Sequence, residues 1–232
     1  MALTGKAALA MWWDVAAAAR AEFEDWHSHE HFRERLGIPG FRRATRWSSA
    51  DGGEGVFQMY ELESHEILSS PHYLARLNAP TPWSTRMMPH HRNMVRSQCR
   101  VLESAGGGVA RHSLTVRLSP AAGRDEALRA SLRELAAQLA DRPGCVGAHL
   151  LRHEAPAIAQ TTEQKMRGAD RYADWVFVAV GYDAAALNSL SAAELGDQAL
   201  TAAGAAPGAE RGLYTLSYTA LPAEADRSES FT

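Results

Sequence analysis

The tripeptide Pro39-Gly40-Phe41 returns as Pro143-Gly144-Cys145, and each copy stands between a helical pattern and an apolar run. The strand-like segment that precedes the helix also recurs, at 8–13 and again at 112–118. Both landmarks repeat at an offset of 104 residues (39 to 143, and 9 to 113). Repeating units of solenoid proteins span about 20–50 residues. A repeat this long therefore indicates a duplicated domain.

The two copies differ in their supply of reactive side chains. Seven of the ten histidines and five of the six tryptophans fall in the first copy. A shared scaffold with unequal chemistry predicts that the first half carries the functional site and the second half supports it.

Each copy has the expected element order β-α-β-β-α-β. The first copy is expected to contain strands at 6–13, 41–48, 55–63 and 93–103 and helices at 15–36 and 64–77. The second is expected to contain strands at 111–118, 145–152, 174–182 and 212–220 and helices at 121–140 and 184–203. This order is that of the ferredoxin-like split motif.

An antiparallel sheet with helices on one face leaves its other face in need of a partner. We therefore predict an α+β fold in which tandem ferredoxin-like repeats pack their sheets face to face, as an intramolecular dimeric α+β barrel. The expected divisions are a site-bearing first repeat at 1–105, a Gly-rich linker at 106–110, a second repeat at 111–221 with an insertion near 154–173, and a flexible tail at 222–232.

Composition excludes several classes of partner. The net charge of −3 gives no global basic field for nucleic acid or an anionic membrane. No segment approaches the roughly 20 apolar residues that cross a bilayer, and the apolar run at 7–13 is too short for a signal peptide. Cys99 and Cys145 have no metal-site spacing and are expected to be reduced thiols. We expect a cytoplasmic protein, in which pairing of the two halves removes the need for a homodimer without excluding one.

Three motifs between residues 23 and 94 point to a family. They are Phe23-x-x-Trp26-x-x-x-Glu30-His31-x-x-Glu34-Arg35-x-x-Ile38-Pro39-Gly40-Phe41-x-x-Ala44, Tyr60-Glu61-Leu62, and Leu77-Asn78-x-Pro80-Thr81-Pro82-Trp83. They resemble the dimeric α+β barrel superfamily, and most closely its duplicated, EthD-like members. The resemblance implies kinship with small-molecule oxygenases, lactone isomerases, haem-degrading enzymes and polyketide cyclases, although many members have no established activity.

The first helix carries a cluster of titratable side chains. These are His27, His29, Glu30, His31, Glu34 and Arg35. Imidazole titrates near neutral pH, so His31 is a candidate general acid or base. Glu30 and Arg35 complete the candidate catalytic set, and the Glu30-His31 pair matches the recurring pattern of the resemblance. The alternative is a structural His31 that bonds a backbone carbonyl near the Ile38-Pro39 turn.

His27 and His31 are four residues apart, so their imidazoles can share one helical face, as a metal site requires. A third ligand would have to come from His65, His72, His90 or His91. The helix lacks the HExxH order, however. We favour a row of half-buried histidines and predict neither a metal nor another cofactor.

Arginines supply the candidate substrate-binding groups. Arg42 and Arg46 share one face of the expected strand at 41–48, and Arg96 lies on the strand at 93–103. If they face the barrel interior, they could bind a carboxylate or enolate oxygen bidentately. The alternative is that they face water, with their stems covering apolar neighbours.

Aromatic side chains and one further histidine complete the binding set. Trp26 and Trp83 are candidate walls of an apolar pocket, with His90 beside them; core packing is the alternative for the tryptophans. The insertion contains a polar, potentially helical stretch at 161–167 that could be a lid over a pocket. We favour an inserted surface helix with a Glu163–Arg167 i,i+4 pair.

The sequence contains no P-loop, no GxGxxG and no GxSxG elbow. The leading hypothesis is a cofactor-independent small-molecule enzyme, of isomerase, cyclase or oxygenase type. Its substrate would be partly apolar and carbonyl-bearing, and His31 would move the proton. The alternative is a non-catalytic protein that binds a small ligand or is associated with stress.

Overall fold

The computed structural model describes residues 3–167 and 170–225, and in that part of the chain eight strands form one closed antiparallel barrel. The strands are β1 (Ala7–Asp14), β2 (Phe41–Ser49), β3 (Gly55–Leu62), β4 (Arg92–Gly106), β5 (His112–Leu118), β6 (Cys145–His153), β7 (Trp175–Gly181) and β8 (Glu210–Ala220). Around the barrel their order is β1-β3-β2-β8-β5-β7-β6-β4.

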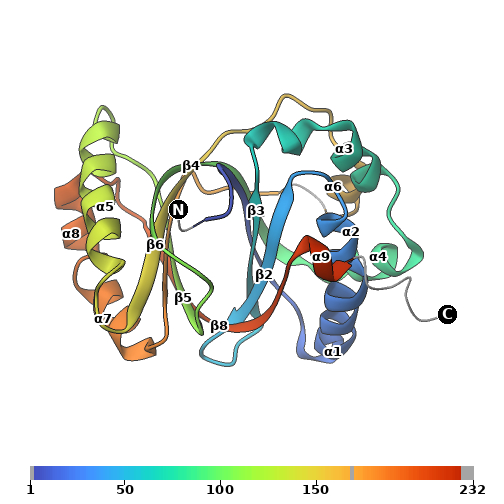
Figure 1. Ribbon diagram of the computed structural model, residues 1–232, viewed down its shortest axis with the longest axis horizontal. Helices are drawn as coiled ribbons and strands as arrows, with labels where there is room; N and C mark the ends of the chain where they lie inside the picture. Colours follow the sequence, from blue (N-terminus) through green and yellow to red (C-terminus); the bar gives the residue numbers. More distant parts are fainter. Residues whose placement is uncertain (1–2, 168–169, 226–232) are drawn as a thin grey trace.

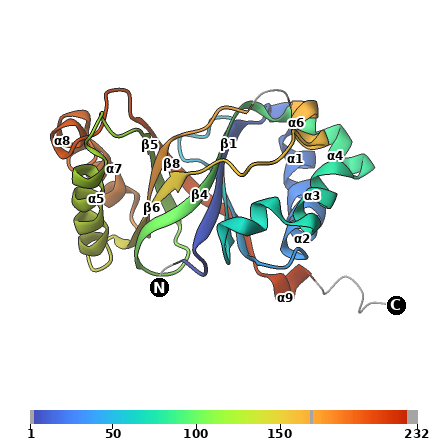
Figure 2. The same cartoon turned by 90° about the horizontal axis from the view of Figure 1, so that it is seen from above.

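Helices cover the barrel on two opposite sides (Figure 1). Beside the first half lie α1 (Ala17–Trp26), the π-helical turn η1 (His27–His31), α2 (Phe32–Leu36), the 3₁₀ turn η2 (His65–Ser69), α3 (Pro71–Asn78), α4 (Pro82–Met87) and the 3₁₀ turn η3 (Met88–His90). Beside the second half lie α5 (Asp125–Leu139), α7 (Ala184–Ala192) and α8 (Asp197–Ala203). Two elements of the later chain, α6 (Thr162–Arg167) and α9 (Pro222–Ala225), lie with the helices of the first half (Figures 1 and 2).

The expected fold is confirmed. Each half contributes four strands in the ferredoxin-like order, β4-β1-β3-β2 and β8-β5-β7-β6. The halves also join edge to edge: β2 pairs with β8, with Arg46 opposite Tyr218, and β4 pairs with β6, with Val101 opposite Leu151. These two seams turn the facing sheets into one continuous barrel, which leaves no open sheet edge.

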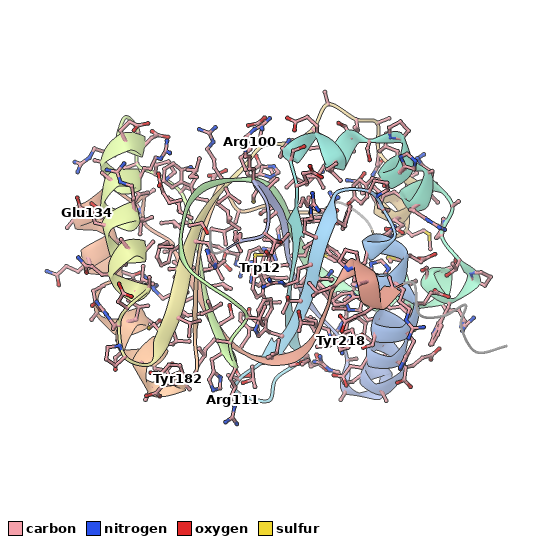
Figure 3. The ribbon with its side chains drawn as sticks, viewed as in Figure 1. Trp12, Arg100, Arg111, Glu134, Tyr182 and Tyr218 are labelled. Carbon is pink, nitrogen blue, oxygen red and sulfur yellow. The ribbon has the colours of Figure 1, made fainter. Side chains whose placement is uncertain are left out.

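Strand alternation separates the barrel interior from an outer face under the helices. On β1, Ala8, Ala10 and Trp12 point inward, whereas Leu9, Met11 and Trp13 pack against the helices of the first half. Figure 3 shows Trp12 in the middle of the barrel. Its ring stacks on Phe57 with a centroid separation of 5.0 Å. Apolar side chains, among them Trp47, Val176 and Val178, fill the middle of the interior.

The arginines considered for a polar barrel lining lie on the outer face. On β4, Val95 and Cys99 belong to the interior cluster, so Arg96 points toward the helices. On β2, Trp47 points inward, and Arg46 next to it points outward, toward α1. Both faces of β2 and β4 are buried in their central segments, so the sequence alternation did not reveal which face was inside.

Several elements differ from their expected form. The long helix expected at 15–36 is interrupted by η1, and the helix expected at 184–203 is two helices. The tail, expected to be flexible from 222 onward, begins with α9, and residues 226–232 lie outside the described residues. Among the described residues, no helix is both long and apolar enough to cross a membrane.

The β4–β6 seam gives a first prediction. Gly106 has φ +72°, and a β-carbon there would collide with the carbonyl oxygen of Val146. Its neighbour Gly107 has open space around it. Gly106→Ala should lower the free energy of unfolding by at least about 2 kcal/mol, because it combines left-handed strain with a backbone clash. Gly107→Ala should change it by less than about 0.5 kcal/mol. Urea unfolding of the two variants checks this, and equal stabilities would contradict the closed seam.

Candidate functional site

A small cavity lies between the outer face of the first half-sheet and the helices that cover it. Its volume is about 30 Å³. Its apolar and aromatic wall comprises Leu9, Met11, Trp13, Tyr60, Tyr73, Leu77, Met88 and Met94. Its polar wall comprises His27, His31, Arg35, Gln58, His91, Arg96 and Glu163. Nearly all of these side chains come from the first half, as the distribution of histidines predicted.

The π-helical turn η1 places two histidines against each other. The backbone N–H of Phe32 bonds to the carbonyl of His27, five residues earlier, which widens the helix by one residue at this turn. The rings of His27 and His31 stack with centroids 5.1 Å apart and planes 13° apart. Such turns recur at functional sites, and this one presents both imidazoles to the cavity.

His27 is uncharged at neutral pH. Burial is the largest cause that lowers the pKa of His27 well below its usual value, and the nearby His31, Arg46 and His91 lower it further. A neutral imidazole keeps a lone pair, so the ring can accept a hydrogen bond.

A third histidine, His91, enters the cavity from the end of η3. Its Nδ1 lies 3.2 Å from the carbonyl oxygens of both Met87 and Met88. Carbonyl oxygens only accept, so Nδ1 carries the hydrogen, and in the neutral ring Nε2 is the basic nitrogen. The ring of His91 lies 5.0 Å from that of Trp13.

An ion pair from the other half of the chain closes the cavity. Arg35 on α2 donates to Glu163 on α6, and each side chain is only 3% exposed. Burial would lower the pKa of Arg35, but Glu163 raises it above its usual value, so the guanidinium stays charged. The backbone N–H of Thr162 donates to Oδ1 of Asn78 at 3.0 Å, which fixes α6 to the end of α3.

The helix α6 of the insertion turns Glu163 inward to Arg35. The side chain of Arg167 lies outside the described residues, so the i,i+4 pair expected between Glu163 and Arg167 stays a prediction. The helix α6 lies among the helices of the first half (Figure 2), and its Glu163 lines the cavity there. The alternative interpretation, a lid over a pocket, stays a prediction.

A second arginine, Arg96, is fixed by a hydrogen bond to Tyr73. Nη2 of Arg96 donates to the hydroxyl of Tyr73 at 2.8 Å, and Arg96 is only 6% exposed. The guanidinium of Arg96 thus lines the cavity on the outer face of β4, and the strand fixes the position of its backbone.

Several buried polar atoms on the cavity wall have no hydrogen-bond partner among the described residues. They are Nε1 of Trp13, Nδ1 of His27, Nη1 of Arg35, Nε2 and Oε1 of Gln58, and the hydroxyl of Tyr60. Gln58 is near enough to His27 and Tyr60 to influence the pKa of each, but its geometry gives no hydrogen bond to either. Buried polar groups are nearly always bonded. Their convergence on one cavity is therefore typical of a site for a polar ligand.

Three of the sequence-derived candidates lie beside the cavity without lining it. Glu30 faces α4, where its Oε1 accepts from the hydroxyl of Thr81 at 2.6 Å and from the indole of Trp26 at 3.1 Å. Trp26 is fully buried, and its ring contacts that of His31 at 4.6 Å. Trp83 packs against the same core from α4. These groups support the helix that carries His31.

Three other candidates lie elsewhere. Arg42 is exposed and pairs with Glu63 at 2.8 Å. Arg46 is buried against α1, with Nη2 donating to the hydroxyl of Ser28 at 3.3 Å. His90 is exposed, and its neighbour His91 takes the place in the cavity. Of the predicted site residues, His31, Arg35 and Arg96 are the ones brought together.

Sequence reasoning missed Gln58 and Tyr73 as site residues, and Tyr60 entered only through the motif Tyr60-Glu61-Leu62. Gln58 had a signal, because it lies two residues from Tyr60 on β3 and therefore shares its face. A glutamine between the apolar residues Phe57 and Met59 is unusual in a core. Within the described residues, no three His, Cys, Asp or Glu side chains are arranged to hold a metal ion.

No protein-family model matches the chain, and no curated protein matches its sequence. Solved structures do share its architecture. An anthrone oxidase-like protein matches with a TM-score of 0.61 at 15% identity, over 96% of each chain. A candidate monooxygenase from Fusobacterium nucleatum matches with a TM-score of 0.62 at 7% identity, over 94% of this chain and 96% of that one. Another from Lactobacillus acidophilus matches with a TM-score of 0.59 at 9% identity, over 94% and 97%. The fold is a dimeric α+β barrel with both halves in one polypeptide.

The ion pair between Arg35 and Glu163 gives a second prediction. Glu163→Gln leaves a buried guanidinium without its counter-charge, and the least costly response is for α6 to open. Amide hydrogen exchange in α6 should accelerate on the order of tenfold to a hundredfold. Lys165→Gln, an exposed change on the same helix, should leave the rate unchanged. Equal exchange in both variants would show that the pair does not hold α6 in place.

Proposed function

We propose that this protein is a small-molecule enzyme whose cavity binds a carbonyl- or phenol-bearing, partly apolar substrate, and in which His31 transfers a proton. The observation that carries the proposal is the set of unpartnered polar atoms on a wall that is half apolar and half polar, directly beside stacked imidazoles. The structural neighbours described as monooxygenases and as anthrone oxidase-like support small-molecule chemistry on this fold.

The wall can stabilise negative charge on a substrate oxygen. The indole of Trp13, the hydroxyl of Tyr60 and Nη1 of Arg35 are unpartnered donors on the same cavity. Donors fixed in advance in a buried site stabilise developing charge far better than donors in water, and a single such donor can contribute a factor of about 100 or more. An enolate or phenolate oxygen is the charge that these groups suit.

His31 is the proton acceptor in this proposal. Proton removal from a carbon next to a carbonyl, or from a phenol, places a positive charge on the imidazole and a negative charge on the substrate oxygen. The neutral state of His27 matters because a charged ring stacked on His31 would oppose its protonation. Trp26, packed on the ring of His31, fixes the ring's orientation.

A substrate can enter the cavity only if part of the protein moves. A volume of about 30 Å³ holds about two water molecules, so the cavity admits a substrate only when it widens. The element best placed to move is α6, a six-residue helix whose contacts include the Arg35–Glu163 ion pair, the hydrogen bond of Thr162 to Asn78 and the packing of Met166 on the core. Opening and closing of this helix would admit the substrate and then exclude water.

Anthrone is a suitable test substrate, because it pairs an aryl ketone with an acidic C10–H bond. Removal of a C10 proton leaves an aryl oxide that dioxygen oxidises to anthraquinone, with the second oxygen atom leaving as water. His31→Gln should lower kcat/KM by at least about 100-fold, the usual contribution of a positioned base. His29→Gln should retain activity, because His29 lies on the same turn with its side chain 62% exposed.

Oxygen uptake and anthraquinone absorbance, corrected for spontaneous oxidation, give the rates. Unchanged turnover in His31→Gln would remove His31 from the reaction. Tight binding of anthrone to the wild type without turnover would favour the non-catalytic binding protein.

A further inference from the structure

A second, larger hollow adjoins the histidine cavity. Its volume is about 320 Å³, and it shares two elements with the cavity. On β4, Arg96 lines the cavity and Gln98 lines the hollow; on α6, Glu163 lines the cavity and Gln164 the hollow. Residues two apart on a strand share a face and lie about 7 Å apart. The two spaces therefore follow one another along the outer face of β4, with α6 across their junction.

The hollow contains an unsatisfied donor. Gln98 is only 7% exposed, and its Nε2 has no hydrogen-bond partner among the described residues. Its backbone is held on both sides: its N–H donates to Nδ1 of His153 at 3.1 Å, and its carbonyl accepts from the N–H of Glu154 at 2.8 Å. A buried amide N–H₂ on a fixed strand requires an acceptor.

The remaining wall determines which acceptor fits. Ala155, Pro156 and Ile158 form an apolar side, and Oε1 of Gln164 is already occupied by Thr161. The described lining residues include the carboxylate of Asp170 but no lysine or arginine. The Asp170 carboxylate would repel an anionic group placed close to it. An uncharged group with an oxygen acceptor and an apolar body fits.

We propose that this hollow is a second binding subsite, which holds the far end of the same substrate through a neutral ether, carbonyl or hydroxyl oxygen bonded to Nε2 of Gln98. The inference rests on the proposed function, because it takes the histidine cavity as the place of the reacting oxygen. That cavity accommodates little more than the reacting group. The bulk of the substrate therefore lies along β4 toward Gln98.

Two isosteric naphthols test this subsite. 6-Methoxy-2-naphthol carries an acceptor at the far end of the ring system, and 6-ethyl-2-naphthol has the same shape without one. Wild-type protein should bind the methoxy compound about tenfold more tightly, because the ethyl compound leaves the Gln98 donor buried and unpaired. Gln98→Leu should abolish this preference. Gln98→Glu, which replaces the donor but retains the size, should abolish it as well and serves if the leucine variant does not fold.

Calorimetric titration gives the dissociation constants, with Gln138→Leu, an exposed change on α5, as the control that keeps the wild-type preference. Equal affinities for the two compounds in the wild type, or a preference that survives in both Gln98 variants, would overturn the subsite and leave the histidine cavity standing. Failure of both compounds to bind the wild type would overturn the proposed cavity, and the subsite with it.

Discussion

The pairing of β4 with β6 is the constraint on which the rest of the structure depends. It closes one side of the barrel, and it also decides where the inserted segment of the second repeat begins. The last pairs of this seam place His153 opposite Cys99 and bond the N–H of Glu154 to the carbonyl of Gln98. The chain therefore leaves β6 beside the outer face of β4, in the first half. It returns along the same strand, where Arg171 exchanges backbone hydrogen bonds with Met94 and Arg96.

This course of the chain between β6 and β7 explains why the candidate site lies in one half of the duplicated fold. The second half covers its sheet with leucines of α5, including Leu128, Leu132 and Leu139, and its core is apolar. In the first half, histidines and arginines lie at the corresponding face. Glu163, from the second half, neutralises the positive charge of Arg35. The site is thus built by both halves, although one half supplies most of its side chains. A buried charge of this kind needs a partner, and the insertion provides it.

The sequence carried enough information for the architecture. The repeated Pro-Gly turns and the β-α-β-β-α-β order were sufficient to predict two ferredoxin-like halves, because hairpins and helix ends are local features. It was harder to predict which face of each strand points into the barrel. The segment 7–13 is buried on both faces, so it has no polar alternation to mark the inside. The sequence offset aligned Leu9 with Ser113, yet Leu9 faces the helices and Ser113 the interior, so the two strands are out of step by one residue.

The same limit applied to the site. His31 and Arg35 were predictable because one helix places them, whereas the choice between His90 and His91 depends on the 3₁₀ turn η3, which has no clear sequence signal. The contact between Glu163 and Arg35 spans 128 residues and follows from the β4–β6 seam. No local pattern could have predicted it.

The most direct test of the account is a crystal structure of the wild-type protein with 2-naphthol. The account predicts ligand density on the outer face of the first half-sheet, with the hydroxyl beside His31 and Arg35 and with α6 displaced from its closed position. Ligand density inside the barrel, or under the helices of the second half, would contradict it.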